Sequence, residues 1–99
     1  MSTLLKDYEL AARRDLSSAT CLPFGAYSAP EIHELESARL FGAEWVLACP
    51  AAFLESPSSY YTVNIAGEAV VVLRDSAGTL RAMSNNCRHR GTPLLAGSG

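Results

Sequence analysis

The sequence predicts an α+β fold, in which an N-terminal helical arm is followed by an antiparallel β meander. Apolar residues recur at helical spacing before residue 44, whereas β-branched residues dominate the runs after residue 60. Short segments that contain glycine separate those later runs. With 99 residues, the chain has room for one globular unit. Within it we expect two parts, the arm and helices over residues 1–44 and the strands over residues 45–99.

Two helices are expected in the first part. Leucine, tyrosine and alanine recur over residues 4–16 with charged residues on the other faces, which favours an amphipathic helix. A second helix is expected to begin near Ser28, because a hydroxyl residue, Pro30 in the first turn and Glu31 three positions on are typical of a capping box. Gly42 is placed where a helix would stop.

The second part contains the predicted strands. Residues 44–49 are apolar and precede a proline, so we expect a short strand there. Residues 60–65 alternate as a half-buried strand does, and residues 69–74 are almost continuously apolar, as in a central strand. After a turn that contains Gly78, residues 79–84 form the last strand, whose open edge is an aggregation hazard.

Three cysteines are too few and too widely spaced for a disulfide framework. Cys49 lies in an apolar run, so we interpret it as a small buried hydrophobe, and Cys21 lies in a loop without a nearby histidine. His33 lies among three glutamates, and charged residues at these spacings usually form a solvated helix face rather than a metal site. Only Cys87 has a neighbour that suits a metal ligand.

A formal net charge of −2 argues against nucleic acid or an anionic membrane as the partner. The N-terminus lacks the apolar stretch of a signal peptide, and no window approaches the roughly 20 apolar residues of a membrane span. We therefore expect a cytoplasmic protein.

Cys87 and His89 are separated by one residue, so both side chains can point to the same side of an extended backbone. Gly91 and Pro93 follow and favour a loop. The two arginines that flank His89 make the loop cationic, which favours a thiolate or an anionic cluster. This pattern indicates a pair of metal ligands.

The segment Cys87-Arg88-His89-Arg90-Gly91 resembles the first half of a Rieske iron–sulfur motif, which has the form Cys-x-His, a spacer, then Cys-x-x-His. The resemblance extends backwards to about Leu22. It identifies the chain as similar to the N-terminal part of large (α) subunits of Rieske non-haem iron, ring-hydroxylating oxygenases. The segments that carry it are residues 30–40, 41–45, 61–68, 70–75 and 78–82. The implied fold is the first part of a Rieske-type β-sandwich.

The resemblance also implies a cofactor and partners. In a Rieske [2Fe-2S] cluster thiolates hold one iron and imidazoles the other, so Cys87 and His89 would bind one iron each. The family's cluster takes electrons from a ferredoxin or reductase. It passes them to a mononuclear Fe(II) in a separate catalytic domain, which activates O2 to hydroxylate an aromatic or other organic substrate. The family often forms trimers, so a homo-oligomer is one option for the complete protein, whose oligomeric state stays open.

No cysteine or histidine follows His89, so the second ligand pair of the motif is expected after Gly99. We therefore expect this chain to hold half of the cluster ligands and to be inactive by itself, although the parent family are oxidoreductases. Two alternatives stay open. One is a small Rieske-type ferredoxin that carries electrons, and the other is a non-catalytic remnant that binds no cluster, or zinc adventitiously.

Overall fold

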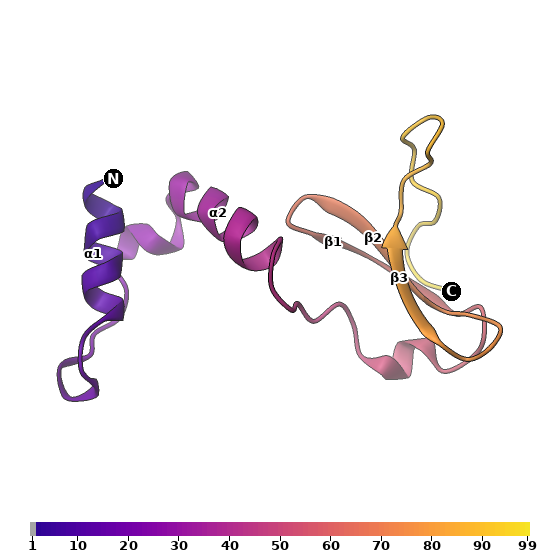
Figure 1. The fold of residues 1–99 in the computed structure, drawn as a ribbon, viewed down its shortest axis with the longest axis horizontal. Helices are drawn as coiled ribbons and strands as arrows, with labels where there is room; N and C mark the ends of the chain where they lie inside the picture. Colours follow the sequence, from indigo (N-terminus) through magenta and orange to yellow (C-terminus); the bar gives the residue numbers. More distant parts are fainter. Residues whose placement is uncertain (1) are drawn as a thin grey trace.

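The computed structural model describes residues 2–99, which form a helical arm and a separate three-stranded sheet joined by an irregular connection (Figure 1). The molecule measures 52 × 34 × 18 Å and has a radius of gyration of 18.5 Å. A compact chain of this length has a radius of gyration of about 13 Å. The arm and the sheet therefore do not share one packed core.

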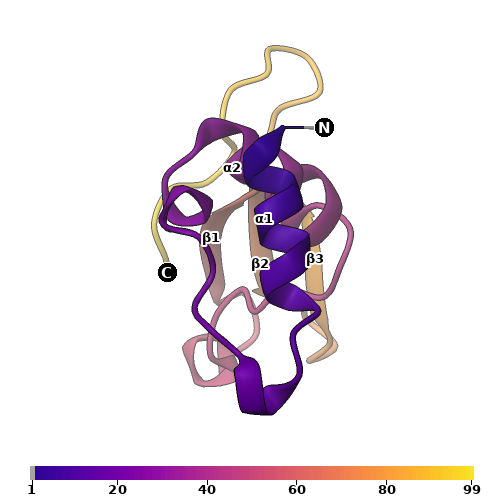
Figure 2. The ribbon, with the colours of Figure 1, turned by 90° about the vertical axis from the view of Figure 1, so that its left-hand side faces the viewer.

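Helix α1 spans Thr3–Ala12 and is shorter than the sequence predicts. Ser2 caps it, because the Ser2 hydroxyl accepts a hydrogen bond from the Leu5 N–H at 3.2 Å. The expected last turn is instead a separate 3₁₀ turn over Leu16–Ser18. A second 3₁₀ turn, Phe24–Tyr27, lies against α1. Figure 2 shows α1 in front of the sheet.

Helix α2 spans Pro30–Glu36 and continues as a π-helical turn over Ser37–Phe41. Proline at the first position is confirmed, but the predicted capping box is wrong. Ala29 is the N-cap residue and offers no side-chain hydrogen bond. The Glu31 carboxylate instead accepts a hydrogen bond from the Ser2 hydroxyl at 2.9 Å, which ties α2 to the start of α1.

Gly42 ends this helical segment, as predicted, but with a φ of −89° rather than the left-handed conformation. Its N–H donates to the Ser37 carbonyl oxygen at 2.9 Å, and a Cβ at this position would lie 2.7 Å from that oxygen. Glycine is required here for close backbone approach.

The predicted strand over residues 44–49 is wrong, since this segment is irregular. The Trp45 side chain is fully exposed, and Cys49 is half-buried rather than buried. An apolar run becomes a strand only when a sheet edge accepts its backbone hydrogen bonds, and here none does. The segment leads into a 3₁₀ turn over Ala51–Leu54, where Leu54 is buried.

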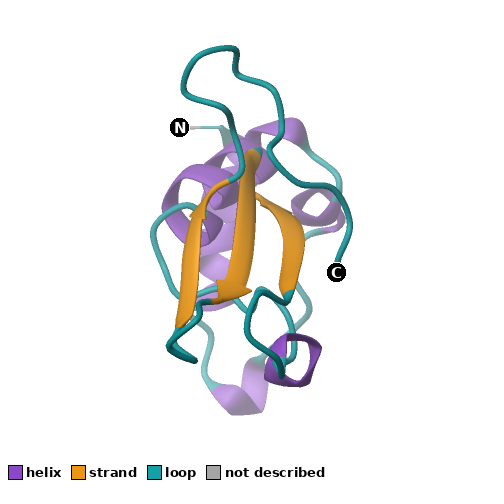
Figure 3. Ribbon diagram, turned by 90° about the vertical axis from the view of Figure 1, so that its right-hand side faces the viewer, coloured by secondary structure: helices purple, strands orange, loops and turns teal. Residues whose placement is uncertain are grey.

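The sheet consists of β1 (Tyr60–Ile65), β2 (Glu68–Arg74) and β3 (Leu80–Ser84), in the order β1-β2-β3 with antiparallel pairing (Figure 3). The predicted meander is confirmed. Val71, on the central strand, is buried. The turn before β3 places Gly78 at a φ of +84°, as its sequence position predicts.

The two edges of the sheet differ. All five residues of β3 are exposed. At the β1 edge, the C-terminal residues 97–99 run antiparallel to the strand, and the Thr62 N–H donates to the Gly97 carbonyl oxygen at 2.9 Å. The apolar core is small, since Ile32 of the arm and Leu54 and Val71 of the sheet region are its buried members among the described residues. No helix within residues 2–99 has the length and apolarity to cross a membrane.

Candidate metal-ligand loop

The loop that carries Cys87 rises from the end of β3 on a narrow two-stranded stem (Figures 1 and 3). Asn86 pairs with Pro93 in an antiparallel bridge. The Cys87 N–H donates to the Thr92 carbonyl oxygen at 2.7 Å. The two arms of the stem are therefore joined at Asn86 and at Cys87.

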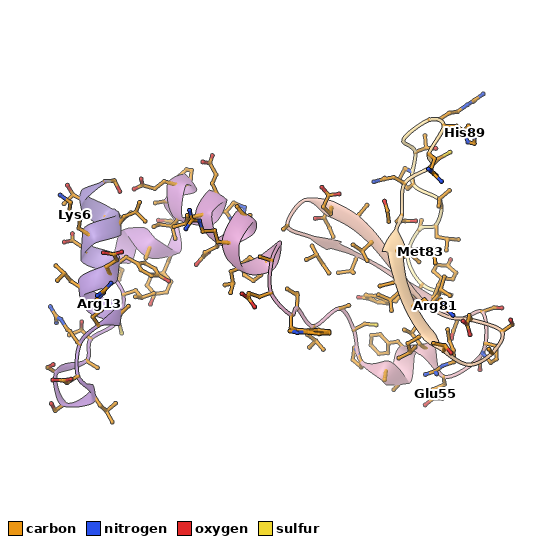
Figure 4. The ribbon with its side chains drawn as sticks, viewed as in Figure 1. Lys6, Arg13, Glu55, Arg81, Met83 and His89 are labelled. Carbon is orange, nitrogen blue, oxygen red and sulfur yellow. The ribbon has the colours of Figure 1, made fainter. Side chains whose placement is uncertain are left out.

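The tip of the loop is a tight turn over residues 88–90. The Gly91 N–H donates to the Cys87 carbonyl oxygen at 2.9 Å and closes the turn. Gly91 has a φ of +65°, a conformation that glycine adopts without the strain of a Cβ. His89 lies at the tip, away from the sheet (Figure 4). The fold thus presents its cysteine and histidine in one projecting loop.

Backbone amides act on the Cys87 sulfur. The N–H of His89, and secondarily that of Arg90, hydrogen-bond to the sulfur and hold the pKa of the Cys87 thiol below its ordinary value, against a smaller opposing effect of burial. These donors favour the thiolate, which is the form that binds metals. Cys87 is half-buried, whereas His89 and its two arginine neighbours are exposed. The loop therefore offers one cysteine whose ionised form is favoured by backbone amides and one accessible imidazole.

Cysteine and histidine are the residue types that hold a Rieske cluster, and the loop supplies one of each. Within residues 2–99, no group of three or more histidine, cysteine, aspartate or glutamate side chains is arranged to hold a metal ion. Cys21 is exposed in the arm, and His33 is exposed on α2. Among the described residues, Cys87 and His89 are the cysteine and histidine that share one loop, and their donor types fit such a cluster.

Sequence reasoning missed the role of Asn85. Its side chain is 4% exposed and makes two hydrogen bonds to the backbone of Leu95, across the base of the stem. The available signal was an asparagine at the end of a strand, two residues before the candidate ligand Cys87. That signal is weak, because asparagine at a strand end is usually only a turn residue.

This part of the molecule is an antiparallel β domain that carries a Cys-x-His loop. The family model described as "Rieske [2Fe-2S] domain" matches residues 44–99. The chain belongs to this family. A Rieske domain implies a [2Fe-2S] cluster, and the loop is the part of the described structure whose donors suit one.

The curated relatives are oxygenase subunits. The oxygenase subunit of carnitine monooxygenase from Escherichia coli K12 is 32% identical over 101 residues, covering 100% of this chain and 27% of the relative. The large subunit of anthranilate 1,2-dioxygenase from Acinetobacter baylyi is 37% identical over 68 residues, covering 69% of this chain and 14% of the relative. The chain thus spans about a quarter or less of the curated relatives it matches.

Solved structures agree with the sequence relatives. A quaternary ammonium Rieske monooxygenase in complex with γ-butyrobetaine has a TM-score of 0.79 at 32% identity, covering 100% of this chain and 27% of that one. Naphthalene 1,2-dioxygenase from Rhodococcus sp. has a TM-score of 0.77 at 31% identity, covering 98% of this chain and 21% of that one. The chain is a domain similar to that of Rieske oxygenase α subunits, and the helical arm is included in the similarity.

Proposed function

We propose that this chain is the cluster-binding N-terminal part of a Rieske oxygenase α subunit. The observation that carries the proposal is the combination of the Cys87–His89 loop with similarity to oxygenase subunits over the whole chain, arm included. In this role the domain receives electrons from a ferredoxin or reductase. It delivers them to a mononuclear Fe(II) that lies in the remainder of the subunit and supports O2-dependent hydroxylation of an organic substrate.

Cys87 and His89 are the proposed ligands, one to each iron of a [2Fe-2S] cluster. Histidine ligation raises the reduction potential above that of an all-cysteine cluster, which is the chemistry that the bound cluster supplies. The N–H groups of His89 and Arg90 stabilise negative charge on the Cys87 sulfur, which favours the thiolate form that binds metals. The second ligand pair is proposed to lie outside this chain.

The substrate class stays broad in this proposal. Relatives of similar identity include carnitine and glycine betaine monooxygenases as well as anthranilate and benzene dioxygenases. The substrate pocket is proposed to lie in the part of the subunit that carries the mononuclear iron.

A small Rieske-type ferredoxin is the competing function. It would need both ligand pairs in one short chain, and it would have no use for the arm that precedes the sheet. The similarity of the arm to the oxygenase structures supports the α-subunit assignment over the carrier.

The first experiment is to sequence the coding DNA downstream of codon 99. We expect a Cys-x-x-His pattern shortly after Gly99 and an open frame long enough for a catalytic domain. A long frame without that pattern contradicts the proposal.

The second experiment compares the 99-residue chain with the longer translated protein after anaerobic loading with iron and sulfide. We expect a Rieske-type visible and EPR spectrum in the longer protein only. Stoichiometric cluster uptake by the 99-residue chain would contradict the half-site assignment. It would favour two chains that each contribute one Cys–His pair.

A further inference from the structure

Asn85 is the buried polar residue of the structure, at 4% exposed, and both ends of its side-chain amide have a partner. Its Nδ2 donates to the Leu95 carbonyl oxygen at 2.8 Å. Its Oδ1 accepts from the Leu95 N–H at 3.0 Å. A buried amide with both ends satisfied by one backbone residue is bound in a single orientation, because the reversed orientation would leave both ends unpaired.

The backbone N–H and carbonyl groups of Asn85 are also hydrogen-bonded. Its N–H donates to the Ala69 carbonyl oxygen of β2 at 2.8 Å, and its carbonyl oxygen accepts from the Leu94 N–H at 3.1 Å. One residue therefore connects the sheet, the outgoing arm of the stem and the returning arm. The side-chain amide acts here as an additional peptide unit that lengthens the pairing between the two arms.

These bonds lie directly below the ligand pair. Cys87 is two residues beyond Asn85, and its N–H bonds to Thr92, which is three residues before Leu95. If the returning arm separates at Leu95, Thr92 is released from its position opposite Cys87. The turn that presents His89 is closed by the Gly91–Cys87 hydrogen bond, so it moves with Cys87.

We propose that Asn85 is a positioning residue that closes the stem and orders Cys87 and His89 for metal binding before a metal is present. The proposal rests on the proposed function only for the identity of the group that the loop binds. The hydrogen bonds themselves belong to the chain without metal. An ordered loop lowers the conformational entropy that cluster binding would otherwise have to overcome.

The side chain must be an asparagine for a specific reason. Aspartate in the same orientation would place an unprotonated oxygen against the Leu95 carbonyl oxygen, so the donor is lost and two acceptors face each other. Asn85→Asp therefore removes one hydrogen bond at nearly constant volume and also places a carboxyl group at a buried position. Asn86→Asp is the matched control, because Asn86 is a half-buried neighbour whose side chain takes no part in these bonds.

The experiment measures residue-specific amide hydrogen exchange and chemical shifts by NMR on the ¹⁵N,¹³C-labelled 99-residue chain at neutral pH. For Asn85→Asp we expect exchange at Leu94, Leu95 and Cys87 to accelerate at least about tenfold, which corresponds to roughly 1.4 kcal/mol of lost protection. The Cys87 and His89 shifts should move toward random-coil values. The exchange rate of the Val71 amide should not change. The Asn86→Asp control should show the same exchange rates as the unsubstituted chain.

Three outcomes overturn the proposal: unchanged exchange at Leu95 and Cys87, equal acceleration throughout the sheet, or the same loosening in Asn86→Asp. If Asn85→Asp does not fold, Leu95→Pro removes the other hydrogen bond of the pair, which the Leu95 N–H donates to Asn85 Oδ1, at an exposed residue outside the sheet. In that variant, the chemical shifts of Cys87 and His89 should change while those of the sheet do not. Since neither measurement needs a bound cluster, failure here is distinguishable from failure of the proposed function.

Discussion

Tyr60 and Gly99 exchange two backbone hydrogen bonds, at 2.7 and 3.1 Å, and so place the C-terminal residues on the outer edge of β1. The Tyr61–Ser98 bridge is the next pair along the strand, between the Tyr60–Gly99 and Thr62–Gly97 pairs. The Thr62 hydroxyl adds a hydrogen bond to the Gly97 carbonyl oxygen at 2.8 Å. The segment that follows the ligand loop therefore adds to the sheet opposite β3.

Deletion of residues 97–99 should weaken this edge. The Tyr60 and Thr62 amides lose their acceptors, so we expect their hydrogen exchange to accelerate by about tenfold or more in NMR measurements. The amide of Val71 in the central strand should keep its rate. Unchanged exchange at Tyr60 would show that the C-terminal pairing does not persist in solution.

Leu54→Ala should destabilise the sheet region strongly. Leu54 is 1% exposed, and its removal leaves a cavity that typically costs about 2–5 kcal/mol in the free energy of unfolding. Urea denaturation followed by circular dichroism measures the change. Leu47→Ala is the control, because Leu47 is 86% exposed and a surface change of this kind usually stays within about 0.5 kcal/mol. Equal effects of the two substitutions would contradict the observed packing.

Asp75 should titrate at low pH. The Arg81 guanidinium donates to its carboxylate at 2.6 Å and holds the pKa of Asp75 below its ordinary value, assisted by the Thr79 and Ala77 N–H groups. The turn is thus stabilised above the unfolded pKa of about 3.9, and this stability is lost as pH falls through the lower folded pKa.

An NMR titration of the Asp75 carboxyl carbon should show this low midpoint. Arg81→Gln removes the strongest contribution, so the pKa of Asp75 should rise toward its ordinary value. Arg88→Gln, in the ligand loop, serves as the control and should leave the midpoint in place. The side chain of Arg81 is 59% exposed, so high salt should reduce the difference between the variants.

Cys87→Ser or His89→Ala, placed in the longer protein of the proposed function, should abolish the cluster. Each substitution removes one proposed ligand, while the strands do not depend on either side chain for their pairing. EPR and visible spectra measure the cluster, and far-UV circular dichroism measures the sheet. A normal Rieske spectrum in either variant would refute the ligand assignment.

Several predictions from the sequence stay predictions. They include the division of the chain into parts at residues 44 and 45, the metal ligands Cys87 and His89, the electron donor and the cytoplasmic location. The antiparallel meander, the proline at the start of α2 and the resemblance to Rieske oxygenase α subunits are confirmed. The capping box at Ser28 and the strand over residues 44–49 are wrong.

Short sequence patterns are enough to specify the strands, the turns and the ligand pair, because each of these depends on residues that are neighbours in the chain. Alternation and β-branching define β1 and β2, Gly78 and Gly91 mark turns that need a positive φ, and one-residue spacing defines the Cys-x-His pair. Tertiary structure alone decides which distant groups satisfy a backbone or side-chain hydrogen bond. It leaves residues 44–49 without a sheet edge, and it places Leu95 against Asn85 to close the stem of the loop. These pairings join residues that no short sequence pattern connects, because a hydrogen bond requires proximity in space and not in the chain.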